Sequence, residues 1–452
     1  MEIFGTDGVR GLAGAELTPL LAYRLGRAGA HVLRRKTAAG APGAGVKPVV
    51  YVGRDTRLSG PMLEAALCAG ICSAGVDAVC AGVVPTPGVA CLARRREALA
   101  GVVISASHNP YQDNGIKFFA AGGCKLPDEW EAEIAAALPE TESLPAAVGR
   151  DIGRIETAPE LVGVYRDFLL ADAPDLTGWK IVVDCANGAA SHIAPPLLQT
   201  LGAEVEPIFC QPNGVNINDG CGSTCPQTLA AAVRRLGADA GLAFDGDADR
   251  LIAVDEEGRI LDGDHIMTIC ALARQRPLPG DAVVVTVMSN IGLYRALRAA
   301  GLTVHWTQVG DRCVMERITA TGAALGGEQS GHIIFPRRHT TGDGIFTALE
   351  LLRVMRRTRR PLSVLGAQME QFPQILLNTP AANKEAALSA PEVLARIRAA
   401  EERLGEDGRV LVRPSGTEPL IRVMLEGRDE GELRRLGQSI VEAVAAVAGR
   451  TA

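Results

Sequence analysis

Three aspartates at alternate positions, Asp245, Asp247 and Asp249, lie between two short apolar runs and are separated by small residues. Carboxylate oxygens at this spacing can converge on one hard divalent cation, such as Mg²⁺. A helix–loop–helix calcium loop is excluded, because the position that requires glycine holds Arg250 and a strand-like segment follows. Three crowded like charges are costly without a cation. The pattern therefore favours a magnesium site over the alternative, a solvated acidic turn.

A second polar loop follows the apolar run 101–104 and contains Ser107 and His108, with Lys117 on the next apolar segment. Open α/β sheets bind ligands at the carboxyl ends of their strands, where this loop is expected to lie. No GxSxG pattern surrounds Ser107, so a hydrolase triad is excluded. A plain turn is the alternative, but the concentration of serine, histidine and lysine in this short segment favours chemistry.

Two further loops carry groups suited to a sugar phosphate. Glu328 and Ser330 are two residues apart and could hydrogen-bond neighbouring sugar hydroxyls. The segment 413–419 offers an arginine, two hydroxyls and a glycine, with Arg422 beyond it, a combination suited to binding phosphate. The sequence contains no Walker A or GxGxxG pattern to anchor a nucleotide. Together, the four loops indicate phosphoryl transfer on a phosphosugar.

Apolar strands that alternate with helices are expected to position these loops. Three apolar runs, 49–53, 180–184 and 282–286, each lead into a polar loop and then into a stretch with a helical pattern. After the first run, this helical stretch spans residues 60–74. Continuous apolar strands of this kind indicate parallel sheets covered on both faces. From Gln374 onward the pattern changes to strands around a Pro/Gly turn and an amphipathic helix. The predicted fold is three similar α/β domains followed by a C-terminal α+β domain.

Length and composition limit the class of protein. The chain has 452 residues, of which 47% are hydrophobic and 22% charged, which excludes a mainly disordered protein. A net charge of −6 and only 4% aromatic residues make nucleic acid an unsuitable partner. No stretch has the pattern of a secretion signal or a membrane span. Eleven cysteines, an odd number, favour reduced thiols. We therefore expect a cytoplasmic protein with neither membrane nor nucleic-acid partners.

Turn-rich or polar stretches suggest where the domains meet. The predicted domains are 1–153 with the serine loop, 154–257 with the aspartate loop, 258–369 with the Glu328 loop, and 374–452 with the phosphate loop.

In this order, the four loops resemble those of the α-D-phosphohexomutase superfamily, in its bacterial branch that acts on glucosamine phosphates. The resemblance covers essentially the whole chain. Further motifs that carry it are Phe4–Gly11, Asn216–Asn218 with Cys221–Thr224, Thr286–Asn290, Gln308–Arg312 and Thr340–Gly344. Two small departures are Ala248, where glycine is also common, and Cys313, where an aromatic residue is expected. Neither departure falls on a residue with an implied role.

The resemblance implies a fold and a set of functional residues. It implies three mixed α/β domains and a TBP-like α+β domain around a central active-site cleft. Ser107 is implied to be the phosphoserine and, with Asp245, Asp247 and Asp249, to hold one Mg²⁺ per chain. Lys117 and His108 are implied to handle protons, and Arg10 and Arg250 to line the cleft. The implied substrate-binding residues are Glu328, Ser330, Arg312, Arg413, Ser415, Gly416, Thr417 and Arg422, of which the last five hold the distal phosphate.

The implied reaction is an isomerisation of glucosamine 6-phosphate to glucosamine 1-phosphate through glucosamine 1,6-bisphosphate, which supplies UDP-N-acetylglucosamine and peptidoglycan precursors. A phosphomannomutase or phosphoglucomutase is the alternative enzyme and would share every catalytic residue. By resemblance, Gln329 and Cys221–Thr224 favour glucosamine. A sugar-phosphate-binding regulator without activity is the non-enzymatic alternative, and the intact Ser107 and aspartates argue against it. A homodimer is left open.

Overall fold

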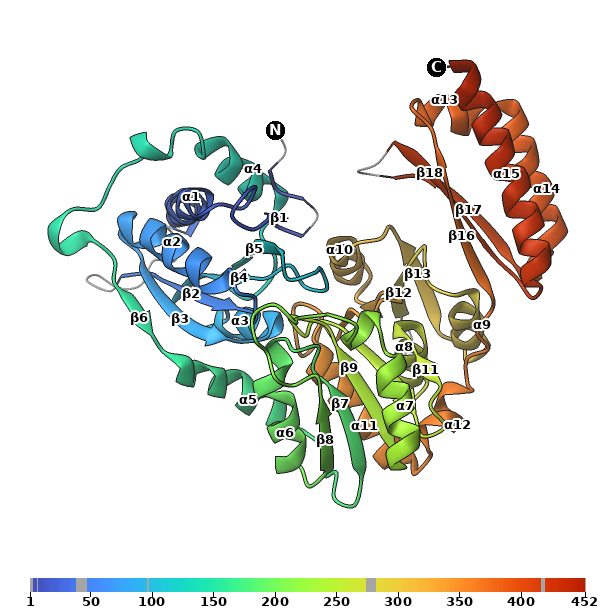
Figure 1. The fold of residues 1–452 in the computed structure, drawn as a ribbon, viewed down its shortest axis with the longest axis horizontal. Coiled ribbons are helices and arrows are strands. Elements are labelled where there is room, and N and C mark those ends of the chain that lie inside the picture. Colours follow the sequence, from blue (N-terminus) through green and yellow to red (C-terminus); the bar gives the residue numbers. More distant parts are fainter. Residues whose placement is uncertain are drawn as a thin grey trace. The chain divides into compact units, whose positions relative to one another are not determined.

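Figure 1 traces the chain in a computed structural model. The residues that the structure describes are 3–5, 7–37, 47–95, 97–273, 282–415 and 419–451. The chain forms two compact units, and each is assembled from two separate stretches of sequence. The first unit consists of Met1–Thr286 and His305–Ala367, and the second of Val287–Val304 and Gln368–Ala452.

The first sheet has six strands in the order β1-β5-β4-β2-β3-β6. Their bounds are β1 (Val9–Leu12), β2 (Val49–Arg54), β3 (Asp77–Val83), β4 (Ala98–Ile104), β5 (Asp113–Ala120) and β6 (Ile155–Thr157). Four of these strands, β2, β3, β4 and β6, are parallel, whereas β5 runs antiparallel to β4, and β1 antiparallel to β5. The β4–β5 connection can therefore be a short loop, and this loop is the one that carries Ser107.

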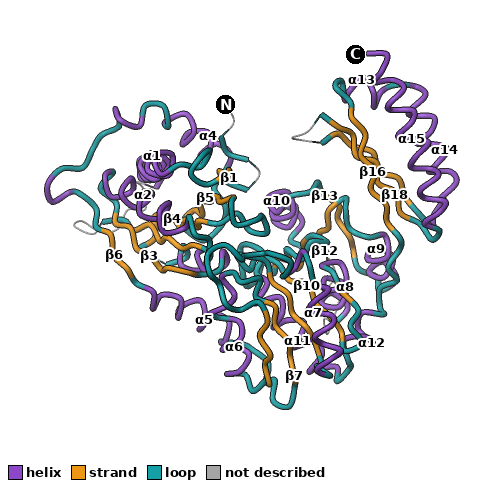
Figure 2. Tube along the Cα trace, viewed as in Figure 1, coloured by secondary structure: helices purple, strands orange, loops and turns teal. Residues whose placement is uncertain are grey.

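Side chains of this sheet alternate between two hydrophobic cores. The strands of the sheet and the helices near it are coloured separately in Figure 2. Val50 and Val52 pack with helices α1 (Pro19–Thr37), α2 (Gly60–Ser73) and α4 (Asp128–Ala137). Tyr51 and Val103 pack on the opposite face with α3 (Thr86–Leu92). Both faces are covered, as the continuous apolar runs predict.

The second sheet has five strands in the order β11-β10-β9-β7-β8. The strands are β7 (Lys180–Asp184), β8 (Glu204–Ile208), β9 (Ala240–Phe244), β10 (Leu251–Asp255) and β11 (Ile260–Leu261), and the helices of this region are α5 (Val162–Leu170), α6 (Ala194–Thr200) and α7 (Gln227–Leu236). Parallel strands β7, β8 and β9 continue into antiparallel β10 and β11. The aspartate loop is the tight connection between β9 and β10.

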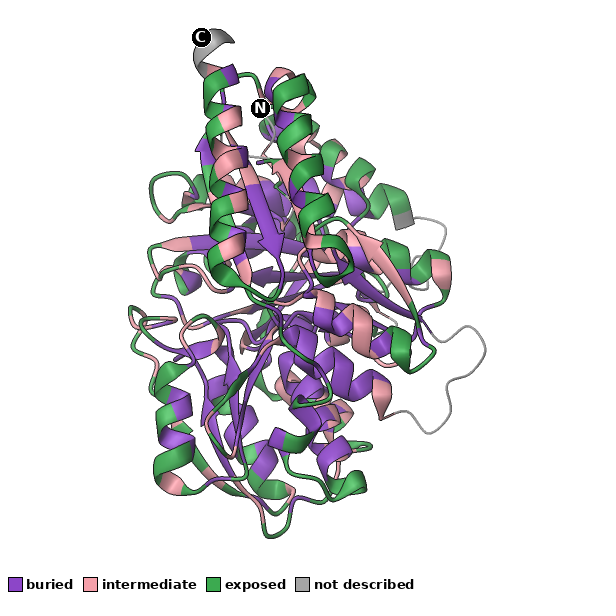
Figure 3. Cartoon of the chain, turned by 90° about the vertical axis from the view of Figure 1, so that its right-hand side faces the viewer, coloured by how far each residue is buried: buried purple, intermediate pink, exposed green. Residues whose placement is uncertain are grey.

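The third sheet has four strands in the order β13-β12-β14-β15. The strands are β12 (Ala282–Thr286), β13 (Thr303–Thr307), β14 (Leu325–Gly327) and β15 (Ile333–Ile334), and the helices are α8 (Gly263–Leu272), α10 (Asp311–Thr321), α11 (Gly344–Thr358) and α12 (Leu362–Gly366). Val284 on β12 packs against Val314 and Ile318 on α10. Figure 3 shows the buried residues concentrated along strands and on the inward sides of helices.

The second unit contains a three-stranded antiparallel sheet in the order β16-β18-β17. Its elements are α9 (Ile291–Ala299), β16 (Gln374–Pro380), α13 (Lys384–Ser389), α14 (Pro391–Leu404), β17 (Arg409–Pro414), β18 (Leu420–Glu426) and α15 (Glu430–Thr451). Alternate residues such as Val412 and Val423 pack with α14 and α15. The early segment joins this unit through hydrogen bonds, since the Asn290 Nδ2 donates to the Phe372 carbonyl at 2.9 Å. The Ile291 N–H donates to Glu426 Oε1 at 3.4 Å.

The predicted fold class, three α/β sheets followed by an antiparallel C-terminal α+β sheet, is confirmed. The first three sheets are mixed, because the parallel strands that the apolar runs indicate are joined by antiparallel strands at one edge of each sheet. An apolar run does not reveal the direction of its neighbour. The boundaries of the four domains remain predictions. All eleven cysteines are free thiols, six of them buried. No helix among the described residues combines the length and apolarity needed to cross a membrane.

Close contact between α1 and α2 depends on glycine. A Cβ on Gly70 would lie 2.0 Å from the Tyr23 carbonyl oxygen, and one on Gly26 would lie 2.2 Å from that of Leu67. Backbone atoms at these positions leave no room for a methyl group.

We expect Gly70→Ala to lower the free energy of unfolding by about 1–3 kcal/mol, because α1 and α2 must move apart. Chemical denaturation measures the change. The control is Gly163→Ala in α5, where the nearest atom lies 3.7 Å away, at the end of the Arg166 side chain. This control should be neutral or stabilising, since alanine is the better helix former. Equal stability of Gly70→Ala and the parent would contradict the proposed packing.

Candidate active site

The three aspartates of the β9–β10 loop converge in the structure. Asp245 and Asp247 are fully buried and Asp249 is 6% exposed. One carboxylate oxygen from each lies within 4.8 Å of the others. Asp247 Oδ1 and Asp249 Oδ1 are buried without a hydrogen-bond partner. Oxygen-only ligands and unpartnered buried lone pairs fit a hard divalent cation.

Neighbouring loops hold the aspartate loop by its backbone. The Thr86 N–H donates to the Asp247 carbonyl at 2.9 Å, and the Gly344 N–H to that of Ala248 at 3.0 Å. Ala248 has a φ of 57°, in the left-handed region that favours glycine. This conformation gives a physical reason why the resemblance leads one to expect glycine at this position. The conformation of the loop is thus fixed by hydrogen bonds to its backbone, not by hydrophobic packing.

Ser107 lies beside the aspartates. Its Oγ donates to Asp245 Oδ2 at 2.5 Å and lies 3.4 Å from His108 Nδ1. The residue is 1% exposed and, with a φ of 51°, also left-handed. A Cβ on Gly246 would lie 2.6 Å from the Ser107 carbonyl oxygen, so glycine permits this approach. The structure therefore brings together the two loops that sequence analysis selected separately.

A buried arginine supports the serine loop. Arg57 forms an ion pair with Asp55 at 2.8 Å, and both side chains are fully buried. Its guanidinium donates to the carbonyls of Ser107 at 3.0 Å and Asn109 at 2.8 Å, and also to those of Pro110 and Asp113. Asp55 accepts a hydrogen bond from Ser105 Oγ at 2.6 Å. Sequence analysis missed Arg57, although its polar loop directly follows a buried strand.

A second network of charges surrounds Lys117. Its Nζ lies 2.7 Å from Asp7 Oδ2 and 3.6 Å from Asp247 Oδ2. Asp7 also pairs with Arg10 and with Lys125, and Lys125 lies 2.6 Å from Asp311. Burial favours a neutral Lys117, but Asp7 and Asp247 raise its pKa above the ordinary value. From the sequence there was no reason to assign a role to Asp7 or Lys125, because the lysines and aspartates with which they pair are distant in the chain.

The charges near the triad shift several pKa values in opposite directions. Burial, together with Asp249 and Asp247, raises the pKa of Asp245. Burial and the nearby Arg250 lower the pKa of His108 to about 4, so its imidazole is neutral at pH 7. His332 Nδ1 lies 3.4 Å from Asp249 Oδ2. Although burial opposes it, this carboxylate raises the pKa of His332 to about 9. His332 was also not singled out from sequence.

The remaining residues of the first unit are less closely tied to the triad. Glu328 Oε1 accepts a hydrogen bond from the Gly310 N–H at 3.0 Å, and its charge helps raise the pKa of Arg250. Ser330 is exposed in the same turn. The Arg312 guanidinium pairs with Glu131 at 2.9 Å and with Asp128, so its donors serve a contact with the 128–131 segment.

The candidate phosphate loop belongs to the second unit. Arg413 and Arg422 are directly opposite one another on β17 and β18. Burial and the charge of Arg422 lower the pKa of Arg413. Lys384 Nζ donates to the Ser415 carbonyl at 2.7 Å and adds a third cation that sequence analysis missed. Gly416 and Thr417 lie outside the described residues. Clustered like charges of this kind favour an anion.

Comparison with known families agrees with the fold. Residues 1–144, 164–258 and 262–372 match alpha/beta/alpha domains I, II and III described for phosphoglucomutase/phosphomannomutase. Residues 376–443 match the C-terminal domain of the same family. The chain belongs to this family of the α-D-phosphohexomutase superfamily.

Several relatives that match nearly the full length of the chain carry the same name. A phosphoglucosamine mutase of Desulforudis audaxviator is 56% identical over 446 residues, which cover 98% of this chain and 97% of the relative. One from Bacillus cereus is 50% identical over 452 residues and covers 99% of both chains. A crystal structure of a phosphoglucomutase/phosphomannomutase family protein from Burkholderia thailandensis has a TM-score of 0.82 at 27% identity, covering 99% of this chain and 97% of that one.

Binding of a divalent cation should release a proton. Because burial and the other aspartates raise the pKa of Asp245, the metal-free triad binds a proton up to a higher pH than an ordinary aspartate does, and a cation competes with this proton. The affinity for Mg²⁺ should therefore rise with pH and fall as Asp245 becomes protonated. Calorimetry in buffers of different ionisation enthalpy should show protons released on binding, in larger number as the pH is lowered.

Asp245→Asn should abolish this proton release. Asp167→Asn, in an exposed ion pair on α5, should leave it unchanged. A pH-independent affinity for Mg²⁺ would contradict the assignment.

Loss of the Arg57 guanidinium should destabilise the fold. We expect Arg57→Met to lower the free energy of unfolding by about 3–5 kcal/mol, because it leaves Asp55 as an unpaired buried charge. Asp55→Leu combined with Arg57→Met should cost less than Arg57→Met alone. Arg35→Met, on the exposed last turn of α1, should change stability by less than about 0.5 kcal/mol. Denaturant midpoints close to the parent value for Arg57→Met would refute this role.

Proposed function

We propose that the chain is a phosphoglucosamine mutase, an isomerase that interconverts glucosamine 6-phosphate and glucosamine 1-phosphate through a phosphoserine and glucosamine 1,6-bisphosphate. The observation that carries the proposal is the 2.5 Å contact between Ser107 Oγ and Asp245 in a buried triad with unpartnered oxygens. Full-length relatives named phosphoglucosamine mutase, at 50–56% identity, support the choice of substrate.

Ser107 is the proposed carrier of the phosphoryl group. In the first half-reaction, the bond between phosphorus and Ser107 Oγ breaks while a bond to the free sugar hydroxyl oxygen forms. The hydroxyl proton is accepted by a side chain of the site, and the neutral imidazole of His108, whose Nδ1 lies 3.4 Å from Ser107 Oγ, is suited to this role. In the second half-reaction the bisphosphate presents its other phosphate to Ser107, which regains a phosphoryl group as the product forms. The enzyme ends as it began, phosphorylated.

Charged residues of the chain divide the remaining work. Lys117, Arg10 and Arg250 supply positive charge where the phosphoryl group moves. Asp245, Asp247 and Asp249, with the seryl phosphate on Ser107, would hold Mg²⁺. When bound, this ion neutralises negative charge on the transferring group. A solved structure of Aspergillus fumigatus N-acetylphosphoglucosamine mutase contains GlcNAc-6P and magnesium, but at 19% identity, with a TM-score of 0.69, its likeness concerns the fold alone.

The substrate is proposed to be bound at both ends. Glu328 and Ser330 contact sugar hydroxyls, while Arg413, Ser415 and Arg422 bind the phosphate that is not reacting. Gly416 and Thr417 are assigned to the same phosphate loop by resemblance. Arg312 is the weakest assignment, since Glu131 and Asp128 already engage its guanidinium. We propose that the reaction takes place in the cytoplasm and supplies UDP-N-acetylglucosamine synthesis.

A parallel assay of three substrates tests the function. Purified, phosphorylated protein with Mg²⁺ is expected to act on glucosamine 6-phosphate with the highest kcat/KM, and more weakly on glucose 6-phosphate and mannose 6-phosphate. A preference for a neutral hexose phosphate would instead establish a phosphoglucomutase or phosphomannomutase. Binding without turnover of any of the three would establish a regulator.

Ser107→Ala should reduce kcat by roughly 10³-fold or more, because it removes the atom that carries the phosphoryl group. Peptide mass spectrometry of the parent protein should locate a phosphate on Ser107. Ser143→Ala, in the turn after α4, serves as a control and should retain parent activity. A phosphate on another residue, together with full activity of Ser107→Ala, would refute the assignment.

A further inference from the structure

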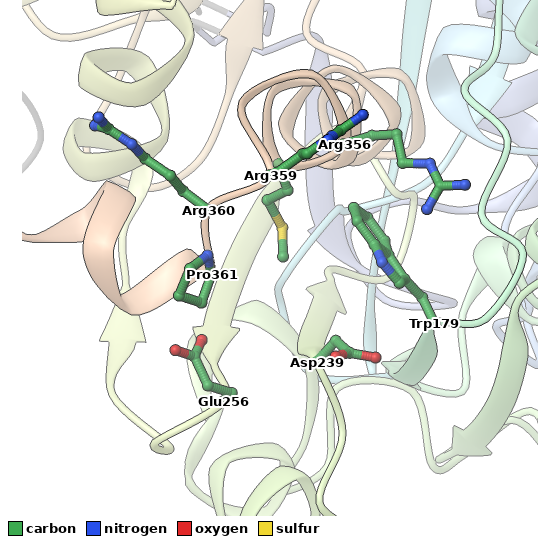
Figure 4. A pocket seen from close by; sticks show the side chains of 8 residues that line it. Trp179, Asp239, Glu256, Arg356, Arg359, Arg360 and Pro361 are labelled. Carbon is green, nitrogen blue, oxygen red and sulfur yellow. The ribbon is translucent and has the colours of Figure 1, made fainter.

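A cavity of about 600 Å³ lies in the first unit, at the end of the five-stranded sheet where β7 and β9 begin. Figure 4 shows the side chains that line it. Trp179 directly precedes β7, and Asp239 directly precedes β9. The triad begins just after the other end of β9, at Asp245. Five residues of strand separate the two ends of β9, which corresponds to about 16 Å. The cavity is therefore separate from the active site.

Three arginines line this cavity, namely Arg356, Arg359 and Arg360. Arg356, on the last turn of α11, pairs with Asp175 at 3.0 Å. Among the described residues, the side chains of Arg359 and Arg360 form neither a hydrogen bond nor an ion pair. Asp239 and Glu256 line the same cavity, so positive charge is confined to the rim, where two adjacent unpaired guanidinium groups favour an anion.

The backbone at Arg359 is unfavourable for its residue type. Its φ of 55° is left-handed and directly follows α11, a position that glycine usually occupies. An arginine is strained in this conformation, whereas a glycine is not. Strain of this kind is a reason to look for a function of the side chain.

The other walls of the cavity differ from the arginine rim. In Figure 4, Trp179 lies on one side and Pro361 on the other, with Asp239 and Glu256 below them. Arg356 stacks on the Trp179 ring at 5.8 Å, so the indole is held in place. Asp239 Oδ2 accepts a hydrogen bond from the Lys180 N–H at 2.8 Å, and Glu256 is held by Ser363. The cavity thus combines an aromatic wall, fixed carboxylates and a cationic rim.

We propose that this cavity binds a phosphorylated compound with a hydroxyl-bearing ring. Its phosphate is bound by Arg359 and Arg360, its ring lies against Trp179, and its hydroxyls donate to Glu256 and Asp239. A volume of about 600 Å³ is suited to such a ligand. The same chemistry is present in a free hexose phosphate and in a nucleoside diphosphate. In this cavity the phosphate of either ligand would be bound by arginine side chains instead of by the backbone N–H groups of a glycine-rich loop.

Calorimetry on the full chain tests the proposal with three probes: UDP, glucose 6-phosphate and inorganic pyrophosphate. The charge is removed by combining Arg359→Asn, since asparagine tolerates a left-handed φ, with Arg360→Gln. This double variant should weaken binding of the ring-bearing ligand at least tenfold. Trp179→Leu should weaken it severalfold without affecting pyrophosphate. Arg35→Gln, on another exposed helix end, is the matched control and should change nothing.

The outcomes separate the two sources of the ligand. Arginine-dependent and tryptophan-dependent binding of UDP supports a nucleoside diphosphate, and that of glucose 6-phosphate supports a hexose phosphate. Binding of pyrophosphate alone overturns the proposal, since it shows only an anionic contact with surface arginines. Binding of all probes that is unchanged in the double variant also overturns it. Mutase activity is not the readout, so the result does not depend on the proposed function.

Discussion

Buried negative charge at one point of the first unit sets the requirements for the residues around it. Asp245, Asp247 and Asp249 converge inside the protein, where unpaired carboxylates are strongly unfavourable. Lys117 and His332 approach this charge directly, and Asp7 and Lys125 extend the pairing outward. The same excess of negative charge that requires these cations is also what suits the site to a divalent ion and, through it, to a phosphoryl group. The same cluster of carboxylates therefore requires positive charge nearby both for the protein to fold and for the site to bind a cation.

The reactive loops have conformations that local sequence preference does not favour. Ser107 and Ala248 both have left-handed φ values, each of which costs about 1–2 kcal/mol for a residue other than glycine. The cost is met by neighbours that bind the backbone, namely Arg57 for the serine loop and the Thr86 N–H for the aspartate loop. Because the loops are held by hydrogen bonds to fixed partners, the distance between Ser107 Oγ and Asp245 is set before any substrate binds. This arrangement is what preorganisation requires.

Features that depend on residues close together in the sequence could be predicted, whereas features that depend on contacts between distant residues could not. The runs 49–53, 180–184 and 282–286 are strands in the structure, because continuous apolar patterns report burial on both faces directly. The triad was predictable because its three ligands are local. Arg57 was not, since its acceptors are separated from it by about fifty positions and are carbonyl groups with no sequence signal. Likewise, no local pattern pairs Arg312 with Asp128 and Glu131, or forecasts that Gly70 must admit the Tyr23 carbonyl.

The discontinuity of the second unit has a consequence for the order in which the molecule can be completed. Val287–Val304 is synthesised before the rest of its unit, Gln368–Ala452. Until Phe372 and Glu426 leave the ribosome, Asn290 and Ile291 lack the acceptors they have in the finished protein. The α9 segment is therefore synthesised before its hydrogen-bond partners, at a stage when β12 and β13, the strands that flank it in the sequence, have both been synthesised. For the same reason no single cleavage of the chain can release the second unit whole, because the polypeptide enters it twice and leaves it once in between.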